Sequence, residues 1–317
     1  MSSSHLLTPP LNPADPIPGA PDKPGIGRRA ARERRGGPGP GRRFSPGNLI
    51  VGIFLSLGAV IMVAPLAWTF STSLKTRDNV FALPPQWIPD PVQWENYIRV
   101  WTAGPLLSGI QNSLIVACSV TIVGTVFSGL AAFAFAKMRM PFKNVIFLFL
   151  LAALMVPFPT LMIPQFTMFA GLGWVDTLLP LIVPFVFGNI VMIFFLRQYL
   201  NNVPDSIVEA ARLDGASFLQ IFIRLILPII KPAVAAQFIL WFMAVWNDYL
   251  APIIYLNSPD IQTLQLVIAS FNAQYAIQTD YPLIMAASFI ALLPVLVVFL
   301  IFQRQIIESI ALTGSKG

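Results

Sequence analysis

The sequence is poor in charge and in the residues that most enzymes use for chemistry. Its 317 residues include 1 His and 1 Cys, and only 11% are charged. A single cysteine cannot form an internal disulfide, and a common Cys/His zinc site needs more ligands than these two residues supply. Soluble domains carry roughly a quarter charged residues, so the composition excludes a soluble globular enzyme. We therefore expect neither catalytic nor metal-binding residues in this chain.

Apolar residues are abundant instead. They make up 56% of the chain, and the mean hydropathy is +0.72. A bilayer core needs roughly 20 consecutive apolar residues per helix, and a backbone in lipid must satisfy its own hydrogen bonds. The sequence therefore predicts an all-α polytopic membrane protein with six transmembrane helices, at about 48–74, 112–136, 144–170, 179–200, 233–256 and 283–303.

The third predicted span is unusual because it contains Pro157, Pro159 and Pro164. Proline removes an intrahelical donor and clashes with the preceding turn. We therefore expect this helix to be kinked or interrupted, either as a packing feature or as a broken helix beside a substrate path.

The first 46 residues differ from the rest of the chain. They hold 10 of the 29 prolines and 8 of the 20 basic residues. Such a segment buries too little apolar surface to become ordered, so we expect a disordered cytoplasmic tail ahead of a transmembrane domain over 47–317. A basic tail can bind nucleic acid or lipid head groups, but a topology signal explains it more simply, and we expect no nucleic-acid partner.

The basic residues also predict the orientation. In the six-span arrangement, 17 of the 20 fall on the side of the tail, and only Lys75, Arg77 and Arg99 fall on the other. Loops rich in Lys and Arg stay in the cytoplasm. Both termini are therefore predicted to be cytoplasmic.

Several sequence motifs are absent. The chain has no G-x-x-x-x-G-K-[ST] phosphate-binding loop, no H-E-x-x-H and no G-x-S-x-G. Asp248 is the only ionisable residue well within a predicted span, whereas a proton-coupled transporter usually needs a relay of buried acids or histidines. These absences disfavour a nucleotide-binding protein, an intramembrane enzyme and a secondary transporter that works alone.

The segment 201–232, between the fourth and fifth spans, has the features of a structured loop. Pro204 suits a first helical position, and Ser206 with Glu209 fits a capping box. We expect a helix over about 206–213. A helix this short is marginal by itself, so either the bundle holds it or a partner receives it in a groove. Gly215 then permits a sharp turn.

This loop resembles a known signature. Glu209-Ala210-Ala211, Gly215 and the Leu225–Pro228 stretch look like the EAA motif of ABC-importer permeases, with Leu225 where the usual residue is Ile. Further segments resemble the carbohydrate branch of that family, similar to the maltose and glycerol-phosphate permeases: Asn112-Ser113-Leu114, 171–177, 196–204, 246–252 and 314–317. The resemblance covers about residues 48–317.

The resemblance implies a role and a set of partners. The chain would be the permease subunit of an ATP-driven importer in the bacterial inner (plasma) membrane, forming a sugar pathway with a second permease. An extracytoplasmic binding protein would deliver the sugar, and a cytoplasmic ATPase dimer would hold the ATP and Mg²⁺, so that this chain needs no cofactor of its own. By match, Glu209, Ala210, Ala211 and Gly215 carry the coupling to the ATPase, although Glu209 can equally serve as a cap.

A polar cluster in the fifth span is the candidate substrate pathway. It consists of Trp246, Asn247, Asp248 and Tyr249. A carboxylate in a span costs about 2.5–3.5 kcal/mol at its centre, so Asp248 should face a cavity or a partner. Sugars are bound by polar side chains together with flat aromatic faces. The alternatives are a hydrogen bond at a subunit interface and a position near the outer membrane surface.

Overall fold

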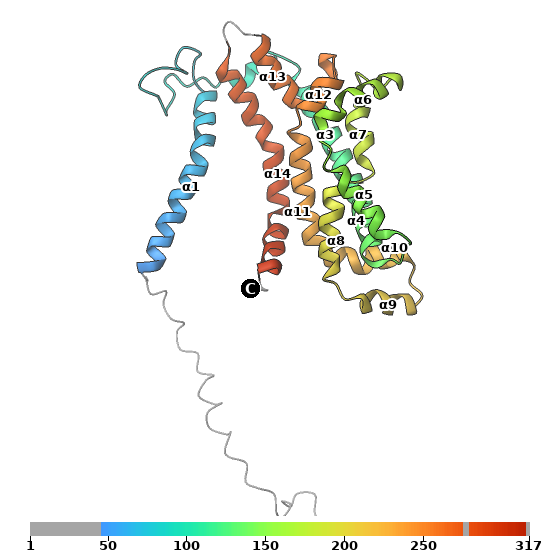
Figure 1. The fold of residues 1–317 in the computed structure, drawn as a ribbon. Helices are drawn as coiled ribbons and strands as arrows, with labels where there is room; N and C mark the ends of the chain where they lie inside the picture. Colours follow the sequence, from blue (N-terminus) through green and yellow to red (C-terminus); the bar gives the residue numbers. More distant parts are fainter. Residues whose placement is uncertain (1–45, 275–278, 315–317) are drawn as a thin grey trace, which may run out of the picture. The chain divides into compact units, whose positions relative to one another are not determined.

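In the computed structural model, residues 46–274 and 279–314 are described, and every regular element within them is a helix (Figure 1). The all-α fold class is confirmed. Residues 1–45 of the predicted tail lie outside the described residues, and so do residues 315–317 of the 314–317 segment that resembles the carbohydrate permeases. The chain divides into two units, Met1–Val60 and Ile61–Gly317. Helix α1 crosses the boundary between them, and the contacts, cavities and sites discussed below belong to the second unit.

The helices vary widely in length. The three longest are α1 (Pro46–Ser73), α11 (Leu227–Trp246) and α14 (Tyr281–Gly314). Two runs are continuous. The first joins α3 (Leu106–Cys118), the π-helix η1 (Ser119–Val123) and α4 (Gly124–Lys137). The second joins α10 (Phe218–Ile221), the π-helix η2 (Phe222–Ile226) and α11. The remaining elements are α2 (Asn96–Arg99), α5 (Lys143–Ala153), α6 (Phe158–Gly171), α7 (Leu179–Val186), α8 (Ile190–Asn201), α9 (Asp205–Leu213), α12 (Leu250–Tyr255), the 3-10 turn η3 (Pro259–Ile261) and α13 (Leu264–Gln274).

Within the described residues, five helical runs are long and apolar enough to cross a membrane, and a bent helix pair makes a sixth if it is one span. The five runs are Leu49–Ser73, Leu106–Lys137, Leu179–Asn201, Phe218–Trp246 and Tyr281–Gln305. The bent pair consists of α5 and α6, which meet at 94°. Pro157 directly precedes α6 in an extended conformation, which confirms the predicted interruption of the third span.

The fifth span differs from its prediction. We expected a continuous helix over 233–256, with Asp248 well inside it. The observed run starts at Phe218 and ends at Trp246, and α12 follows after a short break. The cause is Asp248 itself, whose Oδ1 accepts the backbone N–H groups of Leu250 (3.1 Å) and Ala251 (3.4 Å). Such a side chain offers the backbone an alternative to continuing the helix. Asp248 therefore lies at a helix break and not within a helix.

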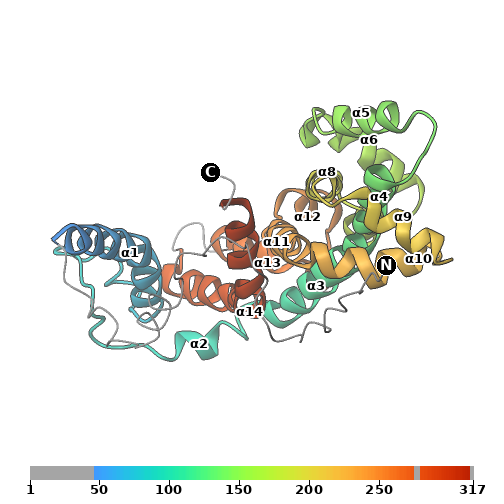
Figure 2. The ribbon, with the colours of Figure 1, turned by 90° about the horizontal axis from the view of Figure 1, so that it is seen from below.

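Helix α11 is the centre of the bundle. It contacts α14, α3, α8 and α4, while α4 packs closely against α8 (Figures 1 and 2). The close packing depends on small residues: a Cβ added to Gly124 would lie 2.3 Å from the Trp241 ring and 3.0 Å from the Phe185 carbonyl oxygen. Only glycine allows α11 and α7 to approach the η1–α4 junction this closely.

A buried carboxylate ties the segment after α1 to the start of α14. The Asp280 side chain is 1% exposed and accepts Nη2 of Arg77 (2.5 Å) and Nη2 of Arg99 (2.8 Å). Burial alone would raise the pKa of Asp280, but the hydrogen bonds from Arg77 and Arg99 outweigh it and hold the pKa below its ordinary value. Asp280 also accepts the Leu283 N–H and so caps α14. This network fixes the end of the bundle that carries α2 and α13.

Candidate functional site

Helix α9 is the predicted short helix of the 201–232 loop. It runs over Asp205–Leu213, one residue longer than expected. Its capping differs from the prediction, because Pro204 is the extended N-cap residue and not the first helical residue, and no side chain caps the helix. Ser206 is therefore already inside the helix, so it forms no capping box with Glu209. A capping box does form at the start of α10, between Ser217 and Gln220.

Gly215 ends α9 in a left-handed conformation, with φ +79°. The Gly215 N–H donates to the Arg212 carbonyl and the Ala216 N–H to the Ala211 carbonyl, both at 3.0 Å. These two bonds define a Schellman motif, whose left-handed position favours glycine. The predicted sharp turn is therefore confirmed, and it directs the chain from α9 into α10.

The two faces of α9 have different surroundings. Val208 and Ala211 are buried against the bundle, whereas Glu209 and Ala210 are exposed and Leu213 is 90% exposed. The bundle thus holds one face of this marginal helix. The other face carries an apolar side chain that a partner can bury.

Lys137, the last residue of α4, holds the start of α9. Its side chain is 4% exposed, and its Nζ donates to the Val203 carbonyl (2.6 Å) and to Asp205 Oδ1 (2.5 Å). The hydrogen bond and the charge of Lys137 lower the pKa of Asp205. The position of α9 is therefore linked directly to the end of a membrane-spanning helix.

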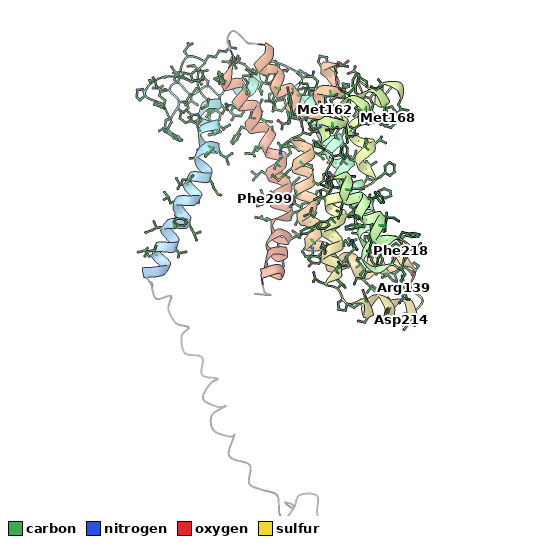
Figure 3. The ribbon with its side chains drawn as sticks, viewed as in Figure 1. Arg139, Met162, Met168, Asp214, Phe218 and Phe299 are labelled. Carbon is green, nitrogen blue, oxygen red and sulfur yellow. The ribbon has the colours of Figure 1, made fainter. Side chains whose placement is uncertain are left out.

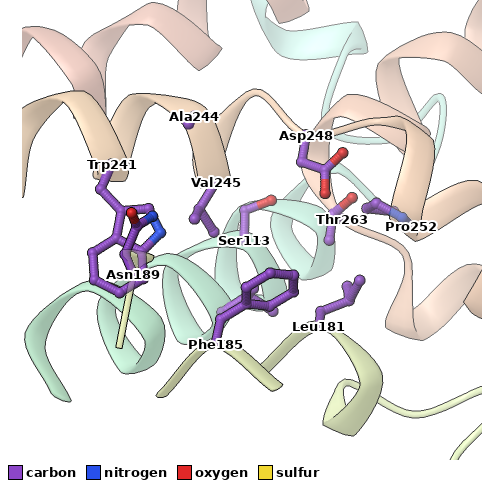
Figure 4. A pocket seen from close by; sticks show the side chains of 11 residues that line it. Ser113, Leu181, Phe185, Asn189, Trp241, Ala244, Val245, Asp248, Pro252 and Thr263 are labelled. Carbon is purple, nitrogen blue, oxygen red and sulfur yellow. The ribbon is translucent and has the colours of Figure 1, made fainter. Parts of the chain in front are cut away.

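A cavity of about 240 Å³ lies beside the break between α11 and α12 (Figure 4). Its lining combines an acid, an amide, two hydroxyls, an indole and apolar side chains: Ser113, Val116, Leu181, Phe185, Asn189, Trp241, Ala244, Val245, Asp248, Pro252 and Thr263. In Figure 4 the Asp248 and Thr263 side chains lie toward one end of this cavity, Trp241 and Asn189 lie toward the other, and Ser113 lies between them. Flat aromatic surface next to convergent polar groups suits a small ligand rich in hydroxyl groups.

Only part of the predicted pathway cluster reaches this cavity. Asp248 lines it. Trp246 is 1% exposed, and its Nε1 donates to the Ala291 carbonyl of α14 at 3.0 Å, so it belongs to the core. Asn247 accepts from Gln265 Nε2 at 3.3 Å, and Tyr249 is exposed. The structure therefore separates these three residues from Asp248.

The Asn112-Ser113-Leu114 segment, which carries part of the family resemblance, positions one part of the cavity wall. Asn112 Nδ2 donates to the carbonyls of Asp260 (2.9 Å) and Gln262 (3.0 Å), and Ser113 Oγ accepts the Leu264 N–H (2.8 Å). These bonds fix the chain on either side of Thr263. The Asn112-Ser113-Leu114 segment does not open the second span as predicted, because the helix already starts at Leu106.

Asp176, in the 171–177 segment, fixes the chain that follows α12. It accepts the Ser258 hydroxyl and the N–H groups of Ser258 and Asn257, all within 2.7 Å, and these bonds lower its pKa. Its own N–H donates to the Tyr255 carbonyl. The sequence did not predict Asn189, Thr263 or Leu181 as lining residues, because they approach the cavity only through the tertiary arrangement of α7, α8 and α13.

Comparison with known proteins agrees with this architecture. The profile of the family "Binding-protein-dependent transport system inner membrane component" matches residues 111–311, and the chain belongs to this family. It is a non-catalytic, multi-pass permease subunit of an ABC importer in the inner membrane, and such a permease works with other subunits of its transport system. These relatives support the importer prediction and not the alternative of a stand-alone secondary transporter.

Individual relatives cover most of the chain. The arabinooligosaccharides transport system permease protein AraQ of Bacillus subtilis (strain 168) is 29% identical over 87% of this chain and 98% of its own length. The sn-glycerol-3-phosphate transport system permease protein UgpE of Yersinia pestis bv. Antiqua (strain Antiqua) is 30% identical over 81% and 94%. The diacetylchitobiose uptake system permease protein NgcG of Streptomyces coelicolor is 30% identical over 85% and 88%.

A solved structure shares the fold. A chain from a bacterial ABC transporter involved in the import of the acidic polysaccharide alginate superposes with a TM-score of 0.69. The alignment covers 83% of this chain and 98% of that chain, at 22% sequence identity. At this identity the likeness supports the fold alone.

Proposed function

We propose that this chain forms, together with a second permease, the membrane pathway of an ABC importer for a neutral carbohydrate. The cavity at the α11–α12 break carries the proposal, because it places a carboxylate, two hydroxyls and an indole around a volume of about 240 Å³. Relatives named for arabinooligosaccharides and diacetylchitobiose support a carbohydrate as the substrate.

The charge of the cavity argues for a neutral substrate. Among the described residues that line it, Asp248 is the only ionisable side chain, and none is a Lys or Arg. An anionic ligand would meet a carboxylate without a compensating cation, which is costly in a partly dry site. A phosphorylated substrate, such as the one for which UgpE is named, fits this cavity less well than an uncharged sugar.

Helix α9 is proposed to couple the pathway to a cytoplasmic ATPase dimer. Its exposed face would enter a groove on the ATPase, while Lys137 transmits its displacement to α4. By match to the EAA motif, Glu209, Ala210, Ala211 and Gly215 take part, with Ala211 and Gly215 shaping the helix and Glu209 and Ala210 facing the partner. An extracytoplasmic binding protein would deliver the sugar, and ATP and Mg²⁺ would bind the ATPase and not this chain.

Sugar uptake by an Asp248→Asn variant tests this function. The importer is expressed in cells that lack it, and uptake is compared among an arabinooligosaccharide, diacetylchitobiose and sn-glycerol 3-phosphate. We expect uptake of the neutral sugar to fall about tenfold, since a hydrogen bond to a charged group contributes about 1.5–3 kcal/mol. Co-purification of the partner subunits should be unchanged.

Asp260→Asn is the matched control, because Asp260 is an exposed carboxylate in η3 that does not line the cavity. It should leave uptake unchanged. If Asp248→Asn loses its partner subunits instead, Asp248 belongs to a subunit interface. Uptake of sn-glycerol 3-phosphate alone would contradict the neutral-sugar assignment.

A further inference from the structure

A second cavity, of about 330 Å³, lies between α9 and the turn that joins α4 to α5. Its lining is rich in charged side chains and consists of Ala136, Lys137, Met138, Arg139, Lys143, Asp205, Val208, Glu209 and Arg212. Figure 3 shows Arg139 at the same end of the bundle as Asp214, which follows α9. We call this cavity the basic pocket.

The basic pocket has an excess of positive charge. Lys137 is neutralised by Asp205 within the wall. Arg139, Lys143 and Arg212 remain, opposed by Glu209, and in the described part of the chain none of these three cations forms an ion pair. The lining as a whole thus carries four basic side chains against the two carboxylates of Asp205 and Glu209. Such an excess of positive charge suits an anion with several acceptor oxygens.

The pocket lies where the membrane surface should be. Lys143 is the first residue of α5, whose Leu148 and Phe149 side chains are 66% and 74% exposed and apolar. Phe142, directly before α5, is 79% exposed and held at φ 55°. A conformation this rare for a non-glycine residue directs a large aromatic side chain outward beside the pocket. This exposed ring extends the exposed apolar surface that Leu148 and Phe149 form on α5.

We propose that the basic pocket binds the phosphate of an anionic phospholipid head group, with the acyl chains lying along α5. Basic pockets at the cytoplasmic ends of membrane helices bind head groups of this kind. Because Arg139 lies in the turn, Lys143 starts α5 and Arg212 lies in the last turn of α9, one phosphate would bridge the bundle and the coupling helix. Lipid composition would then influence how firmly α9 is held.

Lipid binding by the purified full-length chain tests this inference, and it needs no transported sugar, so its outcome is independent of the proposed function. Phosphatidylglycerol is titrated in neutral detergent, and the bound lipid is counted by native mass spectrometry. We expect one tight phosphatidylglycerol, and no comparable binding of phosphatidylcholine. The triple variant Arg139→Gln, Lys143→Gln, Arg212→Gln should weaken that binding about tenfold or more.

The matched control is Arg28→Gln, Arg29→Gln, Arg32→Gln, which removes the same charge from the tail and should leave the tight binding unchanged. A second variant, Arg139→Lys with Arg212→Lys, keeps the charge and should retain the lipid. Thermal unfolding of the triple variant like that of the wild-type protein shows that its loss of lipid does not reflect misfolding. Equal weakening in the tail control would overturn the proposal in favour of diffuse charge.

Two further outcomes would also overturn it. Full competition by low-millimolar inorganic phosphate would assign the pocket to free phosphate. Loss of ATPase co-purification by the triple variant, with phosphatidylglycerol binding intact, would assign the pocket to a protein contact.

Discussion

At the scale of single residues, Thr263 shows how the cavity departs from ordinary packing. Its Oγ1 is buried and has no hydrogen-bond partner in the described structure, although it lines the cavity beside Asp248. Buried polar groups are almost always paired, and an exception calls for an explanation. A substrate hydroxyl that pairs with Thr263 supplies one.

This explanation gives Thr263→Val opposite effects on stability and on uptake. Removing an unpaired buried hydroxyl should leave stability unchanged or raise it by about 1 kcal/mol. Losing one substrate contact should lower the apparent affinity for the sugar about fivefold. Thermal unfolding in detergent and uptake at several sugar concentrations measure the two effects.

Thr72→Val is the control, because Thr72 Oγ1 is also buried and unpaired but does not line the cavity. It should leave uptake unchanged. Normal uptake by Thr263→Val would remove Thr263 from the pathway.

The Asp280 network predicts how stability depends on pH. Its pKa is held below the ordinary value of 3.8, so the bonds to Arg77 and Arg99 stabilise the fold fully above that value and are lost as the pH falls through the lowered pKa. Asp280→Asn keeps the cap on α14 but removes the charge. It should cost about 1–3 kcal/mol at pH 7, discounted because both arginines are partly exposed.

Thermal unfolding of both proteins from pH 7 to pH 3 checks this prediction. The difference between the wild-type protein and Asp280→Asn should stay constant down to about pH 4, near the ordinary Asp value, and shrink below it. A difference that disappears already between pH 7 and pH 5 would show that Asp280 has a raised pKa instead.

At the scale of elements, the loop from α8 to α10 depends on one backbone conformation. Gly215 has φ +79°, and a Cβ placed there would meet no atom within 4 Å. The cost of a side chain at this position is therefore backbone strain alone, about 1–2 kcal/mol for an ordinary residue. A substitution of Gly215 should therefore change the direction of α9 without disturbing the packing of the bundle.

Gly215→Val should therefore insert normally but transport poorly, because the turn relaxes and re-aims α9 relative to the ATPase. Gly215→Asn is the matched variant, since asparagine tolerates the left-handed region, and it should keep most of the transport. Membrane levels, ATPase co-purification and uptake are measured for both. Equal transport by the two variants would show that the direction of α9 does not matter for coupling.

Caps and breaks were the elements that sequence patterns predicted least well. The Ser206–Glu209 pattern fits a capping box, yet the N-cap residue of α9 is Pro204, two residues before Ser206, and the box forms at Ser217 and Gln220 instead. The break at Asp248 was also missed. In both places one local sequence permits two backbone conformations. At Asp248, the bonds that its carboxylate accepts from the Leu250 and Ala251 N–H groups favour the break.

At the scale of the whole molecule, the hydrophobic runs were enough to predict an all-α membrane protein, and the three prolines predicted its interrupted third span. The hydrophobic runs do not predict which helix faces contact one another. The sequence therefore did not predict that Asn189 and Thr263 line the same cavity as Asp248. It also grouped Trp246 with Asp248, although residues two positions apart along a helix lie on different faces of it. Trp246 fills the core against α14, and Asp248 lines the cavity.

The orientation of the bundle rests on charge, and it gives the last prediction. The described structure places Arg139 at one end of the bundle and the α12 end, which leads to Asp260, at the other (Figures 1 and 3). The distribution of Lys and Arg predicts that the Arg139 end is cytoplasmic.

With Cys118 replaced by Ser, an impermeant maleimide added to right-side-out vesicles should label Asp260→Cys directly and Arg139→Cys only after permeabilisation. Reversed labelling would invert the orientation while keeping the helices, and labelling of both from outside would contradict the span arrangement itself. Helix α9 lies at the same end of the bundle as Arg139. The predicted result would therefore place α9 on the side where ATP is available, as coupling to an ATPase requires.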